Sequence, residues 1–261
     1  MQKKSIFLIF TISIALFNLS GCSGKEVNES PAPVENKAAQ LEKRAQEETR
    51  KYDYPAATQA AYDALKLYAL LDEQEGQLRS HIILTRLYLL QEQRDKADKH
   101  LTKARSLAEE MVDGSQIYHI HLLTGKLNND QDEFQQALIA ATTPFEKAVA
   151  ETYLKNYDQA YALIANEEPT SAFEEDDAAF VLLQYARFAD HQDAGKTALD
   201  LFKGNENIIG ISDSLYVLAT IAKKQGDKTK AEHYLRRALE VNIAMGNKRR
   251  IEIIVNELEA L

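Results

Sequence analysis

A spacing of small residues that recurs every 40 residues constrains the fold more than any other feature of this sequence. Ala57, Ala97 and Ala137 follow one another at that interval, and each is followed four positions later by another small or apolar residue. The same spacing recurs around Ala160 and Ala231. Residues three, four and seven positions apart lie on one face of a helix, and small side chains there let another helix approach closely. The pattern therefore predicts an all-α chain built from repeated helices.

A second helical pattern precedes each of these segments and is clearest in residues 214–242. Its apolar residues share one helix face and end before Gly226 and Asp227, which break the helix. The two helices together resemble the tetratricopeptide repeat. The residues that carry this resemblance are Leu218, Ala219, Ala222, Ala231, Leu235 and Ala238, with Leu84, Tyr88 and Gly125 at first-helix positions of other copies.

The resemblance implies a right-handed superhelical solenoid of about six helix pairs with a C-terminal capping helix. The predicted pairs span residues 37–74, 78–114, 115–142, 143–168, 174–204 and 211–245. The fourth pair starts so soon after the third that one of its helices must be short. A single apolar stripe predicts the end helix, which would cover the last pair; its members are Ile251, Ile254, Val255, Leu258 and Leu261. A generic helical bundle is the alternative architecture.

The N-terminus has the pattern of a secretory signal over residues 1–21. Lys3 and Lys4 precede an apolar run from Ile6 to Leu19, which is too short to cross a bilayer, since that takes roughly 20 residues. Leu19-Ser20-Gly21-Cys22 resembles the bacterial lipobox. The resemblance implies that Cys22, the only cysteine, becomes the N-terminus and carries fatty acyl chains such as palmitate on its sulfur and amine.

Residues 22–36 are expected to form a lipidated, flexible tether, because they are rich in Gly, Pro, Ser and charge. Residues 37–261 then form the repeat domain. In lipoproteins of two-membrane bacteria, Asp after the cysteine is the usual signal for retention in the inner membrane. Because Ser23 stands there, we expect a lipid-anchored protein of the outer membrane that faces the periplasm.

The sequence offers no catalytic site, and we expect neither an enzyme nor a cofactor. Phosphate-loop and serine-nucleophile motifs are absent, and acylation would block the only thiol. His119 and His121 point about 200° apart on a helix, so they cannot share a metal ion. The net charge is −9, or about −11 after loss of the signal, which argues against nucleic acid as a partner.

The tetratricopeptide resemblance implies a concave wall lined mainly by the first helix of each pair. The peptide-binding residues transferred on this basis are Arg79, Ile82, Arg86, Leu89, His119, Leu122, Lys126, Phe145, Val149, Tyr216 and Lys223. They predict an apolar floor with basic points in its early part, suited to a peptide that carries carboxylates. Each of these residues also fits an ordinary exposed helix position.

We therefore expect a membrane-anchored scaffold or adaptor that binds other envelope proteins. Two alternatives stay open within the resemblance: a pilotin for a type IV pilus secretin, and a structural lipoprotein that self-associates through the stripe of residues 251–261. A small-molecule substrate is not expected, because the sequence reveals no pocket of converging polar side chains.

Overall fold

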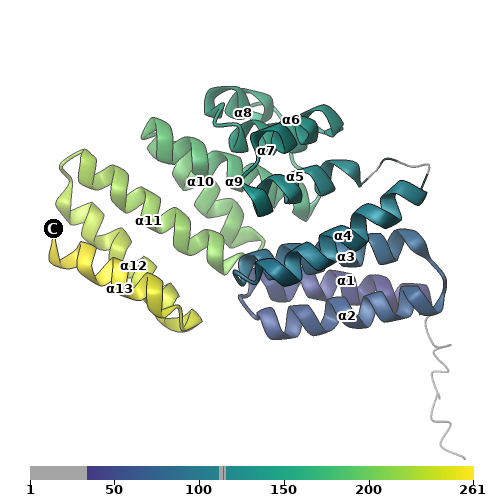
Figure 1. Ribbon diagram of the computed structural model, residues 1–261. Helices are drawn as coiled ribbons and strands as arrows, with labels where there is room; N and C mark the ends of the chain where they lie inside the picture. The colour runs from purple at the N-terminus through teal and green to yellow at the C-terminus, as the bar shows by residue number, and fades with distance from the viewer. Residues whose placement is uncertain (1–33, 112–113, 115) are drawn as a thin grey trace, which may run out of the picture. The chain divides into compact units, whose positions relative to one another are not determined.

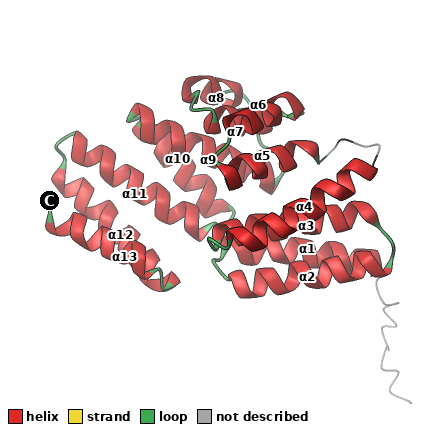
Figure 2. Ribbon diagram, in the orientation of Figure 1, coloured by secondary structure: helices red, strands yellow, loops and turns green. Residues whose placement is uncertain are grey.

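The computed structural model describes residues 34–111, 114 and 116–261, and this part of the chain is entirely α-helical (Figures 1 and 2). It contains 13 helices, and no strand occurs among the described residues. The predicted all-α class is confirmed. The helices are α1 Val34–Arg50, α2 Tyr54–Leu70, α3 Gln74–Leu90, α4 Arg94–Glu110, α5 Ile117–Asn128, α6 Gln131–Ala140, α7 Pro144–Tyr153, α8 Tyr157–Ile164, α9 Ala172–Ala189, α10 Gln192–Gly204, α11 Ile208–Lys224, α12 Lys228–Met245 and α13 Lys248–Glu259.

Consecutive helices pack as six pairs, from α1–α2 to α11–α12, and α13 follows the last pair. Each pair packs against the next, and the first helices of neighbouring pairs also touch, as α1 does with α3 and α9 with α11. The fourth pair is the short one, since α8 has only 8 residues. The paired arrangement agrees with the sequence prediction.

The N-terminal boundary lies slightly earlier than predicted. Helix α1 begins at Val34 rather than at residue 37, and Glu35 in its first turn interacts favourably with the helix dipole. The predicted signal over residues 1–21, the lipidated Cys22 and most of the predicted tether fall outside the described residues.

The alanines of the 40-residue repeat lie at buried contacts between helices. Ala57, Ala97 and Ala137 are completely buried. Gly125 plays the same role on α5, because a Cβ atom there would lie 2.6 Å from the Phe134 ring on α6. The spacing in the sequence thus reflects backbone proximity within and between pairs.

One turn type connects most of the helices. A residue with positive φ is followed by an N-cap residue, whose backbone N–H donates to a carbonyl five residues earlier in the preceding helix. At Gly226 the φ angle is +78°, and the Asp227 side chain then accepts a hydrogen bond from Lys230 N. Because these turns are short, consecutive helices stay next to each other.

The predicted end helix does cover the last pair. Ile254 is completely buried, and Leu258 and Leu261 pack against the cluster formed by residues of α10, α11 and α12. Most of the predicted apolar stripe is therefore engaged within the chain.

The stack of pairs curves enough for the first pair to reach the fifth. Arg50 at the end of α1 donates from Nε to Oδ2 of Asp176 on α9, at 2.8 Å. The other oxygen of Asp176 accepts hydrogen bonds from Asn205 and Asn207, between α10 and α11. This contact joins residues 126 positions apart and links the first pair to the fifth.

Candidate functional site

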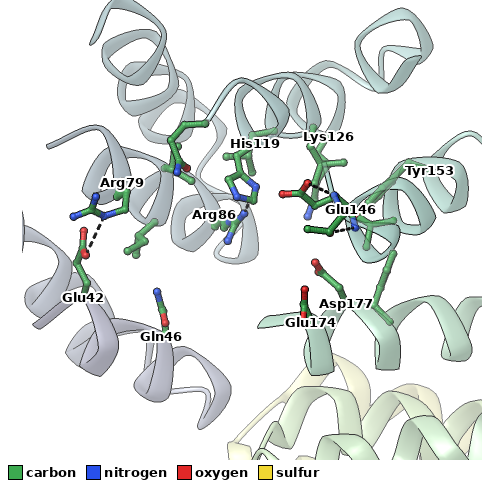
Figure 3. A pocket seen from close by; sticks show the side chains of 18 residues that line it. Glu42, Gln46, Arg79, Arg86, His119, Lys126, Glu146, Tyr153, Glu174 and Asp177 are labelled. Atoms are coloured by element: carbon green, nitrogen blue, oxygen red, sulfur yellow. Dashed lines mark hydrogen bonds and ion pairs between the residues drawn. The ribbon is translucent and has the colours of Figure 1, made fainter. Parts of the chain in front are cut away.

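The curved stack encloses a cavity of about 620 Å³ that we call the inner groove (Figure 3). Its walls come only from the first helix of five successive pairs, α1, α3, α5, α7 and α9, and from the N-cap residues of α5 and α7. The lining residues are Glu42, Gln46, Arg79, Ile82, Ile83, Arg86, Gln116, His119, Leu122, Leu123, Lys126, Thr143, Glu146, Val149, Tyr153, Glu174, Asp177 and Phe180.

The structure brings seven of the eleven predicted groove residues together around this cavity. They are Arg79, Ile82, Arg86, His119, Leu122, Lys126 and Val149. Phe145 points into the core instead and is buried, and Leu89 packs half-buried against the core cluster of the first three pairs. These two side chains therefore pack behind the groove wall and do not line the cavity.

The two remaining residues, Tyr216 and Lys223, lie on α11 under the end helix. The guanidinium of Arg250 lies 4.3 Å from the centre of the Tyr216 ring, and Lys223 forms an ion pair with Glu257 at 2.8 Å. Both partners belong to α13, so this helix occupies the face of α11 that corresponds to the groove wall of earlier pairs.

One end of the groove carries an ion-pair network. Arg79 contacts Glu42 at 3.4 Å and Glu75 at 2.7 Å, and the Tyr68 hydroxyl donates to Glu42. Burial raises the pKa of Glu42, although the neighbouring Arg79 opposes this shift. Arg79 is thus already neutralised by carboxylates of its own chain.

At the centre of the groove, Arg86 donates from Nη2 to Nδ1 of His119, at 2.8 Å (Figure 3). Burial, and then the positive charge of Arg86, lower the pKa of His119 to about 3. His119 is therefore neutral at physiological pH and accepts at Nδ1, which places its own proton on Nε2.

Three carboxylates line the opposite side of the groove: Glu146, Glu174 and Asp177 (Figure 3). Glu146 and Glu174 have structural partners just before or at the start of their helices: Glu146 accepts hydrogen bonds from the Thr142 hydroxyl and two backbone N–H groups, and Glu174 from the Thr170 hydroxyl and one backbone N–H group. Among the described residues, no hydrogen bond or ion pair involves the carboxylate of Asp177.

Asp177 is the most perturbed carboxyl group of this side. Burial is the main cause that raises its pKa to about 7, and the negative charges of Asp176 and Glu146 add to it. Arg86 and Lys126 lower this pKa but do not offset the burial. Asp177 is therefore a carboxyl group without an ion-pair partner among the described residues, and it faces a cavity large enough to admit a cation.

Sequence reasoning missed most of the acidic and aromatic wall. In the run Glu174-Glu175-Asp176-Asp177, Glu174 and Glu175 lie in the first turn of α9, as in an ordinary charged helix start, whereas Asp177 lines the inner groove. Asp177 and Phe180 are three residues apart on α9 and face the groove together. That spacing was the available signal, but the fifth pair matches the repeat too weakly for it to be aligned.

The described residues contain no group of three or more His, Cys, Asp or Glu side chains arranged to hold a metal ion. Within the same part of the chain, none of the helices combines the length and the apolar character that crossing a bilayer requires.

Comparisons with known proteins give little beyond this. No protein-family model matches the chain, and a search of curated proteins finds no match. Among solved structures, the chain is similar to the crystal structure of PilW, described as a widely conserved type IV pilus biogenesis factor, with 18% sequence identity over 84% of this chain and 98% of that one. The TM-score is 0.43, and a similarity of this size identifies neither a family nor an activity.

Proposed function

We propose that this chain is a helical-repeat scaffold of the bacterial cell envelope that binds a segment of another envelope protein in the inner groove. The observation that carries the proposal is the origin of the groove walls in the first helices of five successive pairs. Repeat proteins use such continuous inner surfaces to bind peptides.

The groove supports a partner with both charged and apolar side chains. Its floor includes apolar atoms of Ile82, Leu122 and Val149, while charged groups of both signs stand around it. From the sequence we expected a partner whose carboxylates would contact the basic residues of the groove. Since Arg79 and Arg86 already have partners within the chain, a cationic group against Asp177 fits the groove better.

The lipobox-like sequence at Cys22 supports attachment to a membrane, with the outer membrane as the proposed site. Several acyl chains give stable anchoring, because each buried methylene contributes about 0.8 kcal/mol. The repeat domain would then face the periplasm and recruit its partner at the membrane surface. Metabolic labelling with palmitate tests this part, since a Cys22→Ser variant should lose both the label and the membrane association.

Self-association through the stripe of residues 251–261 receives less support. Ile254, Leu258 and Leu261 already pack within the chain. The apolar residues left exposed nearby are isolated ones such as Ile243 and Ile253, and single exposed apolar residues are normal on monomers.

Photocrosslinking in living cells tests the proposal. Lys126 is the best position for the probe, because its side chain is exposed and lines the inner groove, whereas Ile82 is only 3% exposed and a bulky probe there would disturb the core. A probe at Ile139 on α6, which is 70% exposed and lies outside the groove, serves as the matched control.

We expect one dominant envelope protein to be captured from position 126 and not from position 139. A secretin as the captured protein would identify the pilotin alternative. Equal capture from both positions, or none from position 126 in cells that express the anchored protein, would contradict binding in the inner groove.

A further inference from the structure

The inner groove continues past α7 to the edge of the fourth and fifth pairs. A cavity of about 410 Å³ shares Lys126, Tyr153 and Phe180 with the inner groove. A further cavity, of about 570 Å³, shares Lys155 and Tyr157 with that one. We call these two cavities together the edge groove. Because neighbouring cavities share lining side chains, the three cavities adjoin one another in a row, which we treat as a path from the inner groove outward.

Aromatic rings line this path. Phe134, Tyr153 and Phe180 stack in sequence, with ring centres 5.0 and 5.4 Å apart. At the outer end, Tyr157 and Phe188 stack at 3.8 Å, and Phe188 is 57% exposed although it is a large apolar side chain. An exposed stacked pair at the mouth of a groove is unusual on a monomer surface and indicates a contact site.

Amide side chains surround the rings. They are Asn129, Gln131, Asn156, Gln159 and Gln184, and the charged side chains Lys126, Lys155 and Asp158 line the same cavities. An amide both donates and accepts hydrogen bonds, so this rim suits the carbonyl groups of an extended backbone. An aromatic lining with amide donors is the chemistry by which proteins bind segments in the polyproline II conformation.

Helix α9 sets the length of the path. Asp177, Phe180, Gln184 and Phe188 are spaced three or four residues apart, so they form one stripe along the helix. At 1.5 Å per residue the stripe is about 16 Å long. A polyproline II segment rises about 3.1 Å per residue, so about five residues fit between Asp177 and Phe188.

We propose that the edge groove and Asp177 bind a proline-containing peptide segment in the polyproline II conformation, with a Lys or Arg residue of that segment against the Asp177 carboxylate. The inference rests on the proposed function and specifies the partner. A glycan fits less well, because a neutral sugar offers no cation for Asp177.

Fluorescence anisotropy with the full chain in detergent tests this inference. The probe is a fluorescein-labelled peptide of one arginine followed by a run of prolines. A peptide of the same charge with glycine and serine in place of proline is the control, and a chitooligosaccharide serves as competitor. The variants are Phe188→Ala and Asp177→Asn, with Ile139→Ala, at a 70% exposed position outside both grooves, as the matched control. Thermal melting establishes that each variant is folded.

We expect the proline peptide to bind more tightly than the glycine-serine peptide. Phe188→Ala should weaken it about five- to tenfold, the value of one aromatic contact. Asp177→Asn should weaken the arginine-proline probe but not a probe of proline alone, and Ile139→Ala should change neither. Equal binding of both peptides, no effect of Phe188→Ala, or displacement of the probe by the oligosaccharide would overturn the inference.

The two proposals fail in different ways. If photocrosslinking from Lys126 captures a protein while the proline peptide does not bind, the edge-groove inference is wrong and the scaffold function stands. If the peptide binds while nothing is captured in cells, the inference survives as a binding property and the cellular function fails.

Discussion

At neutral pH, Asp177 lowers the free energy of unfolding because of its position in the groove. Its folded pKa is about 7, well above the ordinary value of 3.8. Between these pH values the folded state binds more protons than the unfolded state. The protein therefore loses stability through Asp177 as the pH rises from about 4 to 7. A residue that costs stability and faces a cavity is typical of a binding site.

Asp177→Asn should therefore stabilise the protein at pH 8, by about 1–3 kcal/mol, because the neutral amide needs no counter-charge. Near pH 3 the difference should nearly vanish, since the carboxyl group is then mostly protonated in both states. Urea unfolding at the two pH values measures this. The exposed Asp98 on α4 provides the control, as Asp98→Asn should change little at either pH. A destabilised Asp177→Asn variant at pH 8 would contradict this account of the site.

His81 and His100 should change stability in the opposite direction, since they destabilise the protein as the pH falls. Their Nδ1 atoms lie 2.9 Å apart between α3 and α4, so at most one of the two carries the proton there. Burial, with the charges of His100 and Lys103, lowers the pKa of His81 to about 4. The hydroxyls of Tyr62 and Tyr88 and the ammonium of Lys96 complete the surroundings of the pair. None of these groups favours the binding of an additional proton by the histidine pair.

The unfolded state takes up a proton on His81 below about pH 6.5, and the folded state does so only near pH 4. Stability from this group is therefore lost as the pH falls through that interval. Between pH 7 and pH 5, the His81→Gln variant should lose about 1–2 kcal/mol less free energy of unfolding than the wild type. Urea unfolding at both pH values measures this difference. An identical loss in the variant would show that the pair titrates normally. His233→Gln, at an exposed position on α12, is the control.

At the scale of the elements, the short turns decide how the pairs stack. Gly226 has a φ of +78° and Gly204 an ordinary helical one, while open space surrounds the position of a Cβ atom at both. An alanine therefore changes only the backbone preference at each site. The two glycines form a natural matched pair.

Gly226→Ala should destabilise the protein by about 1 kcal/mol, because alanine disfavours positive φ. Gly204→Ala should stabilise it by about 0.5–1 kcal/mol, because alanine is the better helix former. Thermal or urea unfolding of the two variants gives both values. Equal signs would mean that the turn after α11 does not depend on its left-handed residue.

Most of the elements could be predicted from the sequence, because helix pairing depends on local spacing. Ala97 and Ala231 mark second helices by their intervals alone, and the structure has those helices as α4 and α12. The groove was only partly predictable. Its acidic wall depends on the curvature of the stack, which brings α9 opposite α3, and α13 covers Tyr216 on α11. Periodicity identifies the face of a helix but not the distant helix that faces it.

At the scale of the whole repeat domain, curvature is held by the contact of Arg50 with Asp176. Only 14% of the Arg50 side chain and 25% of the Asp176 side chain are exposed, so water screens this pair poorly. The two asparagines that donate to Asp176 fix the carboxylate in place. Loss of the arginine leaves Asp176 without its cation and frees the first pair from the fifth.

Arg50→Ala should destabilise the protein by about 2 kcal/mol, the usual value of a charge-assisted hydrogen bond of this kind. Arg236→Ala is the matched control, because Arg236 forms an exposed ion pair with Glu232 within α12 and should contribute less than about 0.5 kcal/mol. Urea unfolding measures both. A loss for Arg50→Ala no larger than that of the control would mean that this contact does not hold the curvature.

The central claim is that the first helices of successive pairs form the surface that binds the partner. Hydrogen exchange of the full chain, alone and with the protein captured from Lys126, tests it most directly. We predict added protection in α1, α3, α5, α7 and α9 and none in α2 and α4, whose residues form the walls of neither groove. Protection confined to the second helices, or to α12 and α13, would contradict the account.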